Sequence, residues 1–561
     1  MEPMHRRRGA PILCRLTLRR TRHGIDRHSQ RSKHRPWRAV APAPSAVPPG
    51  DALKIGSCPE GPLCTHPHVC ETTRFMRIAL FLGLLALVSL CVTLASRSIA
   101  VTTAASELLQ AMRARQVSFA TLFLFYGLVA VFPLALLMPP YQVADEGAHF
   151  LRADDVELGH ALGYRSGANS GGTVDQGIAA SYSIFYPIVL HPENKATAAM
   201  FDRAAAIGWK NNKSFSDFAN TSIYPPIFYS VSALAIAIGK VTDLPVTSTL
   251  TLARMFNGVV GVGLGASSIA LAGVAGPWFF LLLTLPMTLA QMASASQDAL
   301  LFPTAAVAAA LFIRLLRVES SDVAGFALLC VLLAAVSTGR VTYGTLALLP
   351  LILYRIDLLY RVLGALAVAV VAIGWSWIAS SFALVQFGLP GANASGQVRH
   401  ILAQPWSLFG LAVNTIRYQY DLYLESFVGK LGWLDVRLPW LYLALAWGAI
   451  LLGILTSVRV GALTKRASAV TGTVTFALLA SAAALFAALY ISWTPVGNFI
   501  VDGVQGRYFI PLAFFVPALL ATGPRSLLGR SGGAAKIVIA GFPLLTIPVL
   551  ITSIVMRYYQ G

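Results

Sequence analysis

The sequence predicts an all-α, polytopic membrane protein with about 12–13 transmembrane helices and a long outer loop after the first core helix. Two observations support this class. Hydrophobic residues make up 56% of the 561 residues and charged residues only 12%, about half the charged share of soluble domains. Apolar runs long enough to cross a hydrocarbon core roughly 30 Å thick recur from residue 78 to the C-terminus. A soluble enzyme, a fibrous chain and a wholly disordered chain are therefore excluded.

The predicted membrane segments follow one another along most of the chain. In order they cover 78–96, 118–138, 225–240, 253–274, 277–293, 298–316, 323–338, 341–354, 362–383, 439–457, 471–492, 509–523 and 537–556. The segments from 118 onward form one membrane domain, 118–556. Two long polar loops, 139–224 and 384–438, interrupt it.

Residues 1–75 form a basic head that differs in composition from the rest. They carry 14 Lys/Arg and 5 Asp/Glu without apolar periodicity, which predicts disorder. Residues 76–117 add an apolar segment and a linker. If 78–96 spans the membrane, the basic head lies outside, against the positive-inside rule. We therefore interpret 1–75 as an over-extended start that can be dispensed with, and we expect no nucleic-acid partner.

Basic residues predict the orientation of the membrane domain. Lys and Arg recur in every second short loop, at Arg314, Arg317, Arg355, Arg361, Arg459, Lys465, Arg466, Arg525, Arg530 and Lys536. This pattern places those loops in the cytoplasm and both long loops outside. Three apolar runs lie between the first long loop and Asp298, where an even number is required. The break at Gly276-Pro277 indicates that one run is re-entrant or bent.

The first candidate site follows the segment 118–138. Two prolines are followed by Asp145, Glu146, His149 and Arg152. In a helix Asp145 and His149 share a face, so this stretch offers a general base, a metal ligand and a phosphate contact. The alternative is a solvated helix start that favours acidic residues. An HExxH motif is absent, which disfavours a zinc protease.

The second candidate is Asp298, in Ser294 to Asp298. It is the only carboxylate between Asp243 and Glu319 in a long apolar stretch. Ionisable residues at membrane depth are costly and are functional candidates for that reason. The alternative is a structural cap of a helix start.

The third candidate comprises Arg340 and the stretch that contains Gln505, Gly506, Arg507 and Tyr508. Both arginines fall on the predicted outer side, against the positive-inside bias. A guanidinium suits bidentate binding of phosphate oxygens, and Gly506 allows close backbone approach. Anchoring to lipid headgroups is the alternative.

These motifs resemble a bacterial membrane family, the domain-of-unknown-function family numbered 2142. The matching pieces are Pro139 to Phe150, Tyr224-Pro225-Pro226, Ser294 to Asp298, and Gly503 to Phe509, and the resemblance covers about 118–556. Ala144 and Gly147 depart from the family, which usually has proline there. That family looks like the GT-C glycosyltransferases, which transfer sugars from polyprenyl-phosphate donors at the outer membrane face.

The resemblance implies a specific chemistry. Asp145 or Glu146 is the catalytic base, and Arg340 and Arg507 bind the donor phosphate. His149, Arg152, Asp298, Gln505 and Tyr508 are supporting residues. Asp298 and His149 are candidate ligands of a divalent metal, Mg or Mn, and a metal-free reaction is equally open.

The resulting hypothesis is an integral-membrane glycosyltransferase (hexosyl or pentosyl transfer) of the bacterial cytoplasmic membrane. Its expected partners are a polyprenyl-phosphate sugar donor, a glycan or lipid acceptor of the cell envelope, and membrane lipids. The alternatives are a lipid-linked glycan flippase or transporter, a polysaccharide polymerase or ligase, and an assembly protein. We expect the following five residues to converge on one outward-facing cavity: Asp145, Glu146, Asp298, Arg340 and Arg507.

Overall fold

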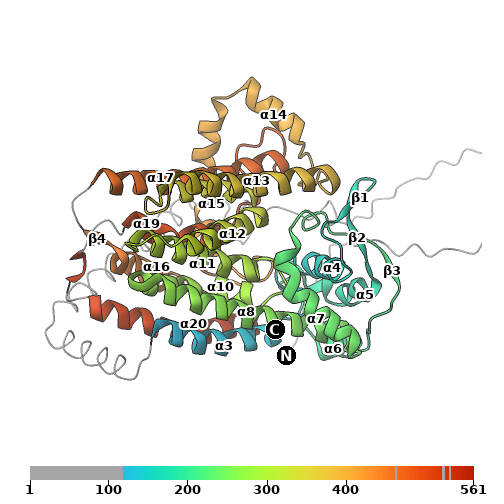
Figure 1. Cartoon of the computed structure of the whole chain (residues 1–561). Helices are drawn as coiled ribbons and strands as arrows, with labels where there is room; N and C mark the ends of the chain where they lie inside the picture. The colour runs from blue at the N-terminus through green and yellow to red at the C-terminus, as the bar shows by residue number, and fades with distance from the viewer. Residues whose placement is uncertain (1–117, 461–463, 521–524, 530–531, 561) are drawn as a thin grey trace, which may run out of the picture. The chain divides into compact units, whose positions relative to one another are not determined.

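The computed structural model describes residues 118–460, 464–520, 525–529 and 532–560, and helices dominate them (Figure 1). The predicted all-α membrane class is confirmed, because seven helices in this part are long and apolar enough to cross a membrane. They are α3 (Phe119–Leu137), α8 (Val246–Ala272) with its continuation through η3 (Gly273–Ala275) and α9 (Gly276–Leu283), α11 (Asp298–Arg317), α13 (Leu358–Phe382), α16 (Trp440–Ser457), α17 (Lys465–Ser492) and α20 (Gly532–Tyr558). The expected head 1–75 and the apolar segment 78–96 lie outside the described residues.

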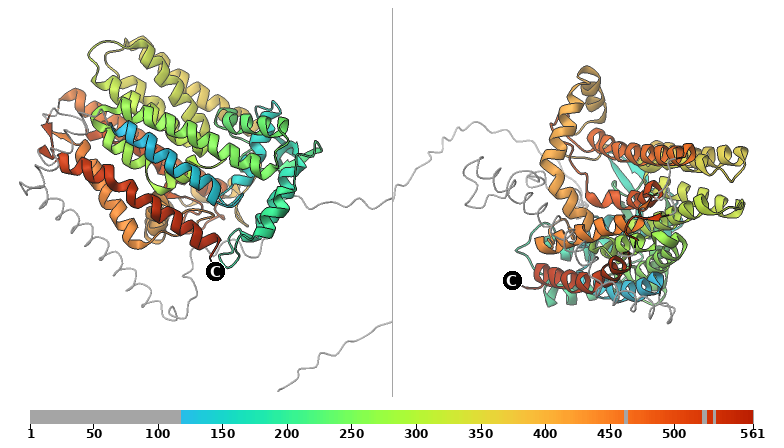
Figure 2. Two further views of the ribbon diagram at one scale, coloured as in Figure 1. Left: turned by 90° about the horizontal axis from the view of Figure 1, so that it is seen from below. Right: turned by 90° about the vertical axis from the view of Figure 1, so that its left-hand side faces the viewer.

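Small residues bring the central helices close together. A Cβ atom added at Gly265 of α8 would lie 2.6 Å from the Phe123 ring of α3, and one at Gly258 would lie 3.0 Å from Val131. Close packing of this kind replaces the hydrophobic driving force that helices lack inside a lipid bilayer. Helices α3 and α20, from opposite ends of the described chain, lie side by side (Figures 1 and 2).

Two predicted segments are not single helices, and these predictions were wrong. The run 277–293 is divided between α9 and α10 (Pro286–Met292), with a break at Thr284 and Leu285. The run 509–523 is divided among η5 (Gly506–Phe509), α18 (Ile510–Ala513) and α19 (Val516–Leu520). An eight-residue helix rises only about 12 Å, so none of these pieces spans alone. Every residue from 275 to 303 is buried, and a membrane tolerates broken backbone where protein encloses it.

The predicted segment 225–240 is also not a crossing. It forms η2 (Pro226–Tyr229) and α7 (Ser230–Val241). Both ends of this unit bind α4 (Glu146–Glu157): the Tyr229 hydroxyl contacts His149, and the Lys240 ammonium donates to Asp154 and Glu157. The unit therefore lies beside the first long loop. Without this segment, two apolar runs are left between that loop and Asp298, namely α8 and the broken α9–α10 unit, and two is the even number that the predicted orientation requires.

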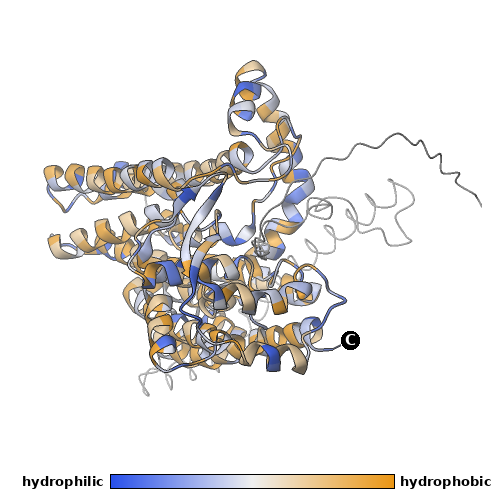
Figure 3. Cartoon of the chain, turned by 90° about the vertical axis from the view of Figure 1, so that its right-hand side faces the viewer, coloured by the Kyte–Doolittle hydropathy of each residue, from blue (hydrophilic) through white to orange (hydrophobic). Residues whose placement is uncertain are grey.

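The first long loop is a folded lobe. It contains α4, a three-stranded antiparallel sheet in the order β1-β2-β3, and two further helices. These elements are β1 (Tyr164–Ser166), β2 (Asn169–Asp175), α5 (Gln176–Phe185) with η1 (Tyr186–Ile188), α6 (Ala198–Ala205) and β3 (Lys213–Asp217). Figure 3 looks onto the end of the molecule that carries this lobe.

The second long loop, 384–438, is mostly helical. It contains α14 (Ala394–Ala403) and α15 (Ser407–Val428), and the second half of α15 packs against η5. Two shorter apolar elements, α12 (Val323–Gly339) and the 3-10 helix η4 (Val341–Ile352), lie earlier in the chain. The strands β4 (Arg459–Val460) and β5 (Arg525–Ser526) pair at the opposite end from the lobe.

The basic loops gather at the end of the helices away from Asp298. Helix α11 begins at Asp298 and carries Arg314 and Arg317 in its last turn. The guanidiniums of Arg361 and Arg466 lie 5.3 and 5.1 Å from the Tyr354 ring centroid. This grouping on one side agrees with the pattern read from the sequence.

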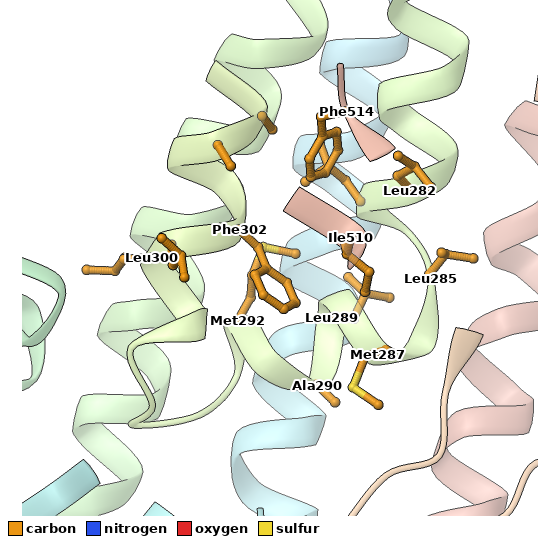
Figure 4. Close-up of a cluster of buried hydrophobic side chains, with 14 of the residues drawn as sticks. Leu282, Leu285, Met287, Leu289, Ala290, Met292, Leu300, Phe302, Ile510 and Phe514 are labelled. Atoms are coloured by element: carbon orange, nitrogen blue, oxygen red, sulfur yellow. The ribbon is translucent and has the colours of Figure 1, made fainter. Parts of the chain in front are cut away.

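A continuous apolar core supports the loops at the other end. Figure 4 shows side chains of α10, α11 and α18 meeting in it, among them Leu289, Phe302 and Ile510. These side chains are 2% exposed or less. The core therefore fixes the loop that precedes Asp298 and the segment that carries Arg507.

Candidate functional site

The turn after α3 sets the directions of Asp145 and Glu146. Asp145 has φ +62° in the left-handed region, and α4 begins at Glu146. Aspartate adopts this conformation more readily than most residues. The His149 N–H donates to the Asp145 carbonyl at 3.0 Å. The Asp145 carboxylate is 40% exposed and accepts a hydrogen bond from Asn220 at 3.0 Å.

Asp145 begins a row of charged and aromatic side chains. Its carboxylate lies 4.0 Å from the Arg507 guanidinium. Cζ of Arg507 and Cζ of Arg340 lie 5.5 and 4.1 Å from the centroid of the Tyr508 ring. Arg340 donates to both carboxylate oxygens of Asp298 at 2.9 Å. These contacts bring four of the five expected residues together: Asp145, Asp298, Arg340 and Arg507. Glu146 lies apart from the row, bound to Arg254, and an outward-facing cavity shared by these residues stays a prediction.

Arg507 is buried without a full set of hydrogen bonds. Its side chain is 7% exposed, and its nearest carboxylate lies beyond hydrogen-bond distance. Among the residues that the structure describes, nothing accepts a hydrogen bond from its Nε. A buried charge without close partners is costly. This guanidinium is therefore suited to bind an anion.

Gly506 allows helix α15 to hold this arginine in place. A Cβ atom at Gly506 would lie 2.0 Å from the Tyr423 carbonyl oxygen of α15, so only glycine fits. The Gly506 N–H donates to the Ser426 hydroxyl at 2.7 Å. The sequence-based expectation of a close backbone approach is confirmed, but the approach is to α15.

The supporting residues of this stretch have distinct roles. The Tyr508 carbonyl accepts a hydrogen bond from the Tyr343 hydroxyl at 2.6 Å, which fixes the ring beneath the two arginines. Gln505 has a buried side-chain oxygen without a hydrogen-bond partner in the described part of the chain. It is therefore a further polar group that a ligand can satisfy.

His149 lies in an aromatic pocket beside the row. Its Nδ1 lies 2.7 Å from the Tyr229 hydroxyl, and its ring stacks on Tyr224 at 6.2 Å between centroids. Burial lowers the pKa of His149 to about 3; Asp298 opposes this shift, and Arg507 and Arg340 add to it. The imidazole is therefore neutral at ordinary pH.

Burial also raises the pKa of the Asp145 carboxyl above its ordinary value, and Arg507 and the Asn220 hydrogen bond partly oppose this effect. A carboxylate with a raised pKa is a stronger base. Asp145 therefore combines access, basicity and an adjacent cation.

Glu146 is placed differently. It is fully buried, and Arg254 binds its two carboxylate oxygens at 2.8 and 2.5 Å. Arg254 also donates to the carbonyls of Ala135, Met138 and Pro139, and the Ala295 N–H donates to Glu146 at 3.2 Å. This pair joins α3, α4 and α8 to the loop that precedes Asp298. The geometry gives Glu146 a positioning role.

Two residues outside the sequence prediction matter here. Arg254 lies inside α8, and its charge in an apolar run was the available signal. Asn220 gave no signal, because an amide in a polar loop is ordinary.

Arg152 does not join the site. Its guanidinium donates to Asp155 and to the carbonyls of His160, Ala161 and Tyr224. These bonds hold the buried Arg152 side chain inside the lobe, apart from the row of side chains around Arg507.

The residues present do not fit a divalent-metal site. Both Asp298 oxygens hold Arg340, and His149 Nδ1 contacts Tyr229. In the described residues no group of three or more His, Cys, Asp or Glu side chains could hold a metal ion.

A hollow of about 10 Å³ borders Arg507. Gln291 and Lys430 contribute polar groups to its lining, and Met138 and Val143 contribute apolar ones. It has room for roughly one water molecule. A sugar is larger, so binding one requires the surrounding segments to separate.

Comparisons with known proteins agree with a membrane domain. Residues 123–516 match the model of a family described as "Predicted membrane protein (DUF2142)". No curated protein and no solved structure matches the chain.

Proposed function

The chain belongs to the DUF2142 family of predicted membrane proteins, and from the site described above we propose that it is an integral-membrane glycosyltransferase. It takes a sugar from a polyprenyl-phosphate-linked donor and transfers it to a hydroxyl of a cell-envelope glycan or lipid. The resemblance to GT-C enzymes is a fold-level analogy, and the support for the activity comes from the side chains of the site.

One observation carries the proposal: a buried, incompletely bonded Arg507 lies 4.0 Å from a partly exposed carboxylate, that of Asp145. Transfer from a phosphate-linked donor needs an anion site for the leaving group and a base for the acceptor. This pair offers both. Its place beside a membrane bundle suits a donor whose lipid chain lies in the bilayer.

The reaction that these residues support is a single displacement. The acceptor oxygen forms a bond to the anomeric carbon while the bond from that carbon to the phosphate oxygen breaks. The acceptor proton passes to the Asp145 carboxylate. The leaving polyprenyl phosphate keeps the bonding electron pair, and Arg507 with Arg340 stabilises its charge.

Other residues hold this arrangement in place. Asp298 binds Arg340 through both oxygens, and the Glu146–Arg254 pair ties the Asp145 turn to the Asp298 loop. Neutral His149 packs between Tyr224 and Tyr229. Fixed polar groups of this kind stabilise developing charge without reorganising.

We place the site on the outer face of the bacterial cytoplasmic membrane. The support is the position of the basic loops at the other end of α11, since basic loops remain in the cytoplasm.

The test is a transfer assay with the full chain in nanodiscs. Radiolabelled hexosyl and pentosyl polyprenyl phosphates are supplied with cell-envelope glycan acceptors, and release of polyprenyl phosphate is measured, because every such donor yields it. We expect release by the wild-type protein, loss in Arg507→Gln, and no change in Arg203→Gln, which alters an exposed arginine of α6. If no donor is cleaved and labelled donor only moves between leaflets, the protein is a transporter and the proposal is wrong.

A further inference from the structure

Helices α14 and α15 form a hairpin that exposes a large apolar surface. The side chains are Leu402, Trp406, Phe409, Val413 and Ile416, which are 75, 89, 78, 49 and 63% exposed. We call this set the hairpin face. Phe409, Val413 and Ile416 follow a spacing of four and three residues, which places them on one side of α15. Single exposed apolar residues are ordinary, but a contiguous group marks an interaction surface.

The opposite side of the hairpin is firmly packed. The Val501 N–H donates to the Thr415 hydroxyl at 3.0 Å, and the Gly497 N–H donates to the Gln397 side chain at 3.0 Å. Thr415 and Gln397 are buried. The hairpin is therefore an ordered element, and its apolar face is a built feature of the fold.

Helix α13 presents a second apolar surface, which is suited to face lipid. On α13, the side chains of Ile373, Trp377 and Phe382 are 66, 69 and 62% exposed, as expected for a membrane helix. Helix α14 contacts α17, and it stands out from the layer that α13 and α17 form (Figures 1 and 2). The occupant that suits both surfaces is the same bilayer.

Charge favours an anionic lipid surface. The sequence has no Asp or Glu between Asp357 and Asp421, whereas Arg399 and Arg417 flank the hairpin face. Basic residues beside an apolar helix face are attracted to anionic headgroups. The amphipathic ring of Trp406 suits the boundary between acyl chains and headgroups.

We propose that the hairpin face inserts into the lipid leaflet next to the candidate site, with Arg399 and Arg417 at the level of the lipid phosphates. The inference goes beyond the proposed function and does not depend on sugar transfer. Because the other half of α15 holds Gly506 through Ser426, membrane insertion of the hairpin also anchors the segment that carries Arg507.

Photo-crosslinking tests this inference. The full chain is reconstituted in nanodiscs of phosphatidylcholine and phosphatidylglycerol, with p-benzoylphenylalanine in place of Phe409 or Ile416. The control places the same group at Glu193, an exposed residue of the lobe. We expect phospholipid adducts several-fold more abundant at 409 and 416 than at 193. Adducts with a second copy of the chain, or no excess of lipid adducts over the control, would overturn the proposal.

A more conservative substitution tests the inference independently, in case the crosslinker variants misfold. Trp406→Phe keeps an aromatic side chain on the exposed surface. Brominated phosphatidylcholine should quench the tryptophan fluorescence of the wild-type protein more than that of Trp406→Phe. Equal quenching would show that Trp406 does not contact lipid and would contradict the inference.

Exchanging phosphatidylglycerol for phosphatidylcholine should reduce the crosslinking yield at positions 409 and 416. An unchanged yield would contradict the role of the two arginines.

Discussion

Substitution of Asp145 by asparagine separates catalysis from structure. Asparagine keeps the size of the side chain, tolerates the left-handed backbone, and can still accept the hydrogen bond from Asn220 through its side-chain oxygen. It cannot take a proton from an acceptor hydroxyl. We therefore expect sugar transfer to fall by roughly 10²–10⁴-fold, the usual contribution of a general base.

The stability of Asp145→Asn should change little. The carboxylate is 40% exposed and lies 4.0 Å from Arg507, and such partly exposed pairs contribute about 0–1 kcal/mol. Burial raises the pKa of Asp145 in the folded state, so above that pKa the charged carboxylate opposes folding. Asparagine removes this unfavourable effect together with the attraction to Arg507, so the two changes in the free energy of unfolding largely cancel.

Glu146→Gln should show the reverse pattern. Its carboxylate is buried and bound by Arg254, and removing one partner of a buried pair costs about 3–5 kcal/mol. We expect a lower unfolding temperature, and any activity lost should follow the amount of folded protein. Asp145→Asn should therefore lose sugar transfer and keep its stability, whereas Glu146→Gln should lose stability and keep transfer per folded molecule.

The assay measures polyprenyl phosphate release per folded molecule, with thermal unfolding measured in the same preparation. Asp243→Asn is the matched control for Asp145→Asn, because Asp243 also has a positive φ and is exposed. It should leave both readings unchanged. Full transfer by Asp145→Asn would refute the assignment of the base, and normal stability of Glu146→Gln would refute its positioning role.

Two further predictions concern Arg507 and His149. Arg507→Lys keeps the charge but loses the planar guanidinium fork. We expect its affinity for polyprenyl phosphate, measured by native mass spectrometry, to weaken by roughly 10–100-fold, which corresponds to the loss of one charge-assisted hydrogen bond. The control variant Arg203→Lys should bind normally. The pKa of His149 falls from 6.5 to about 3 on folding, so the unfolded chain binds more protons between these values and stability decreases as pH falls through this window. His149→Gln should flatten that pH dependence of thermal unfolding, and an unaltered slope would contradict a buried neutral imidazole.

Much of the membrane architecture could be predicted from the sequence, because length and hydropathy decide which runs can span. The failures occurred where the chain folds back. The run 225–240 is apolar, but Lys240 and Tyr229 bind α4 and hold it beside the lobe. Apolar composition does not distinguish a helix covered by lipid from one covered by protein. The breaks in 277–293 and 509–523 likewise depend on the packing that encloses them.

The members of the site were predictable from their scarcity, but their pairing was not. Asp298 and Arg340 are 42 positions apart, and Glu146 and Arg254 are 108 apart. Such pairs form only when the helices pack. The difference between Asp145 and Glu146 depends on one backbone conformation: the left-handed turn at Asp145 starts α4 at the next residue.

The buried arginines at this end of the molecule differ in how many hydrogen bonds their side chains make. Arg254 binds Glu146 and three carbonyls, and Arg152 binds Asp155 and three carbonyls. Arg340 is held by Asp298. Arg507 is also buried, but its nearest carboxylate, that of Asp145, lies 4.0 Å away. Since burial makes an incompletely bonded cation costly, and Gly506 holds this segment against α15, we expect Arg507 to be the arginine that binds an anion from outside the chain.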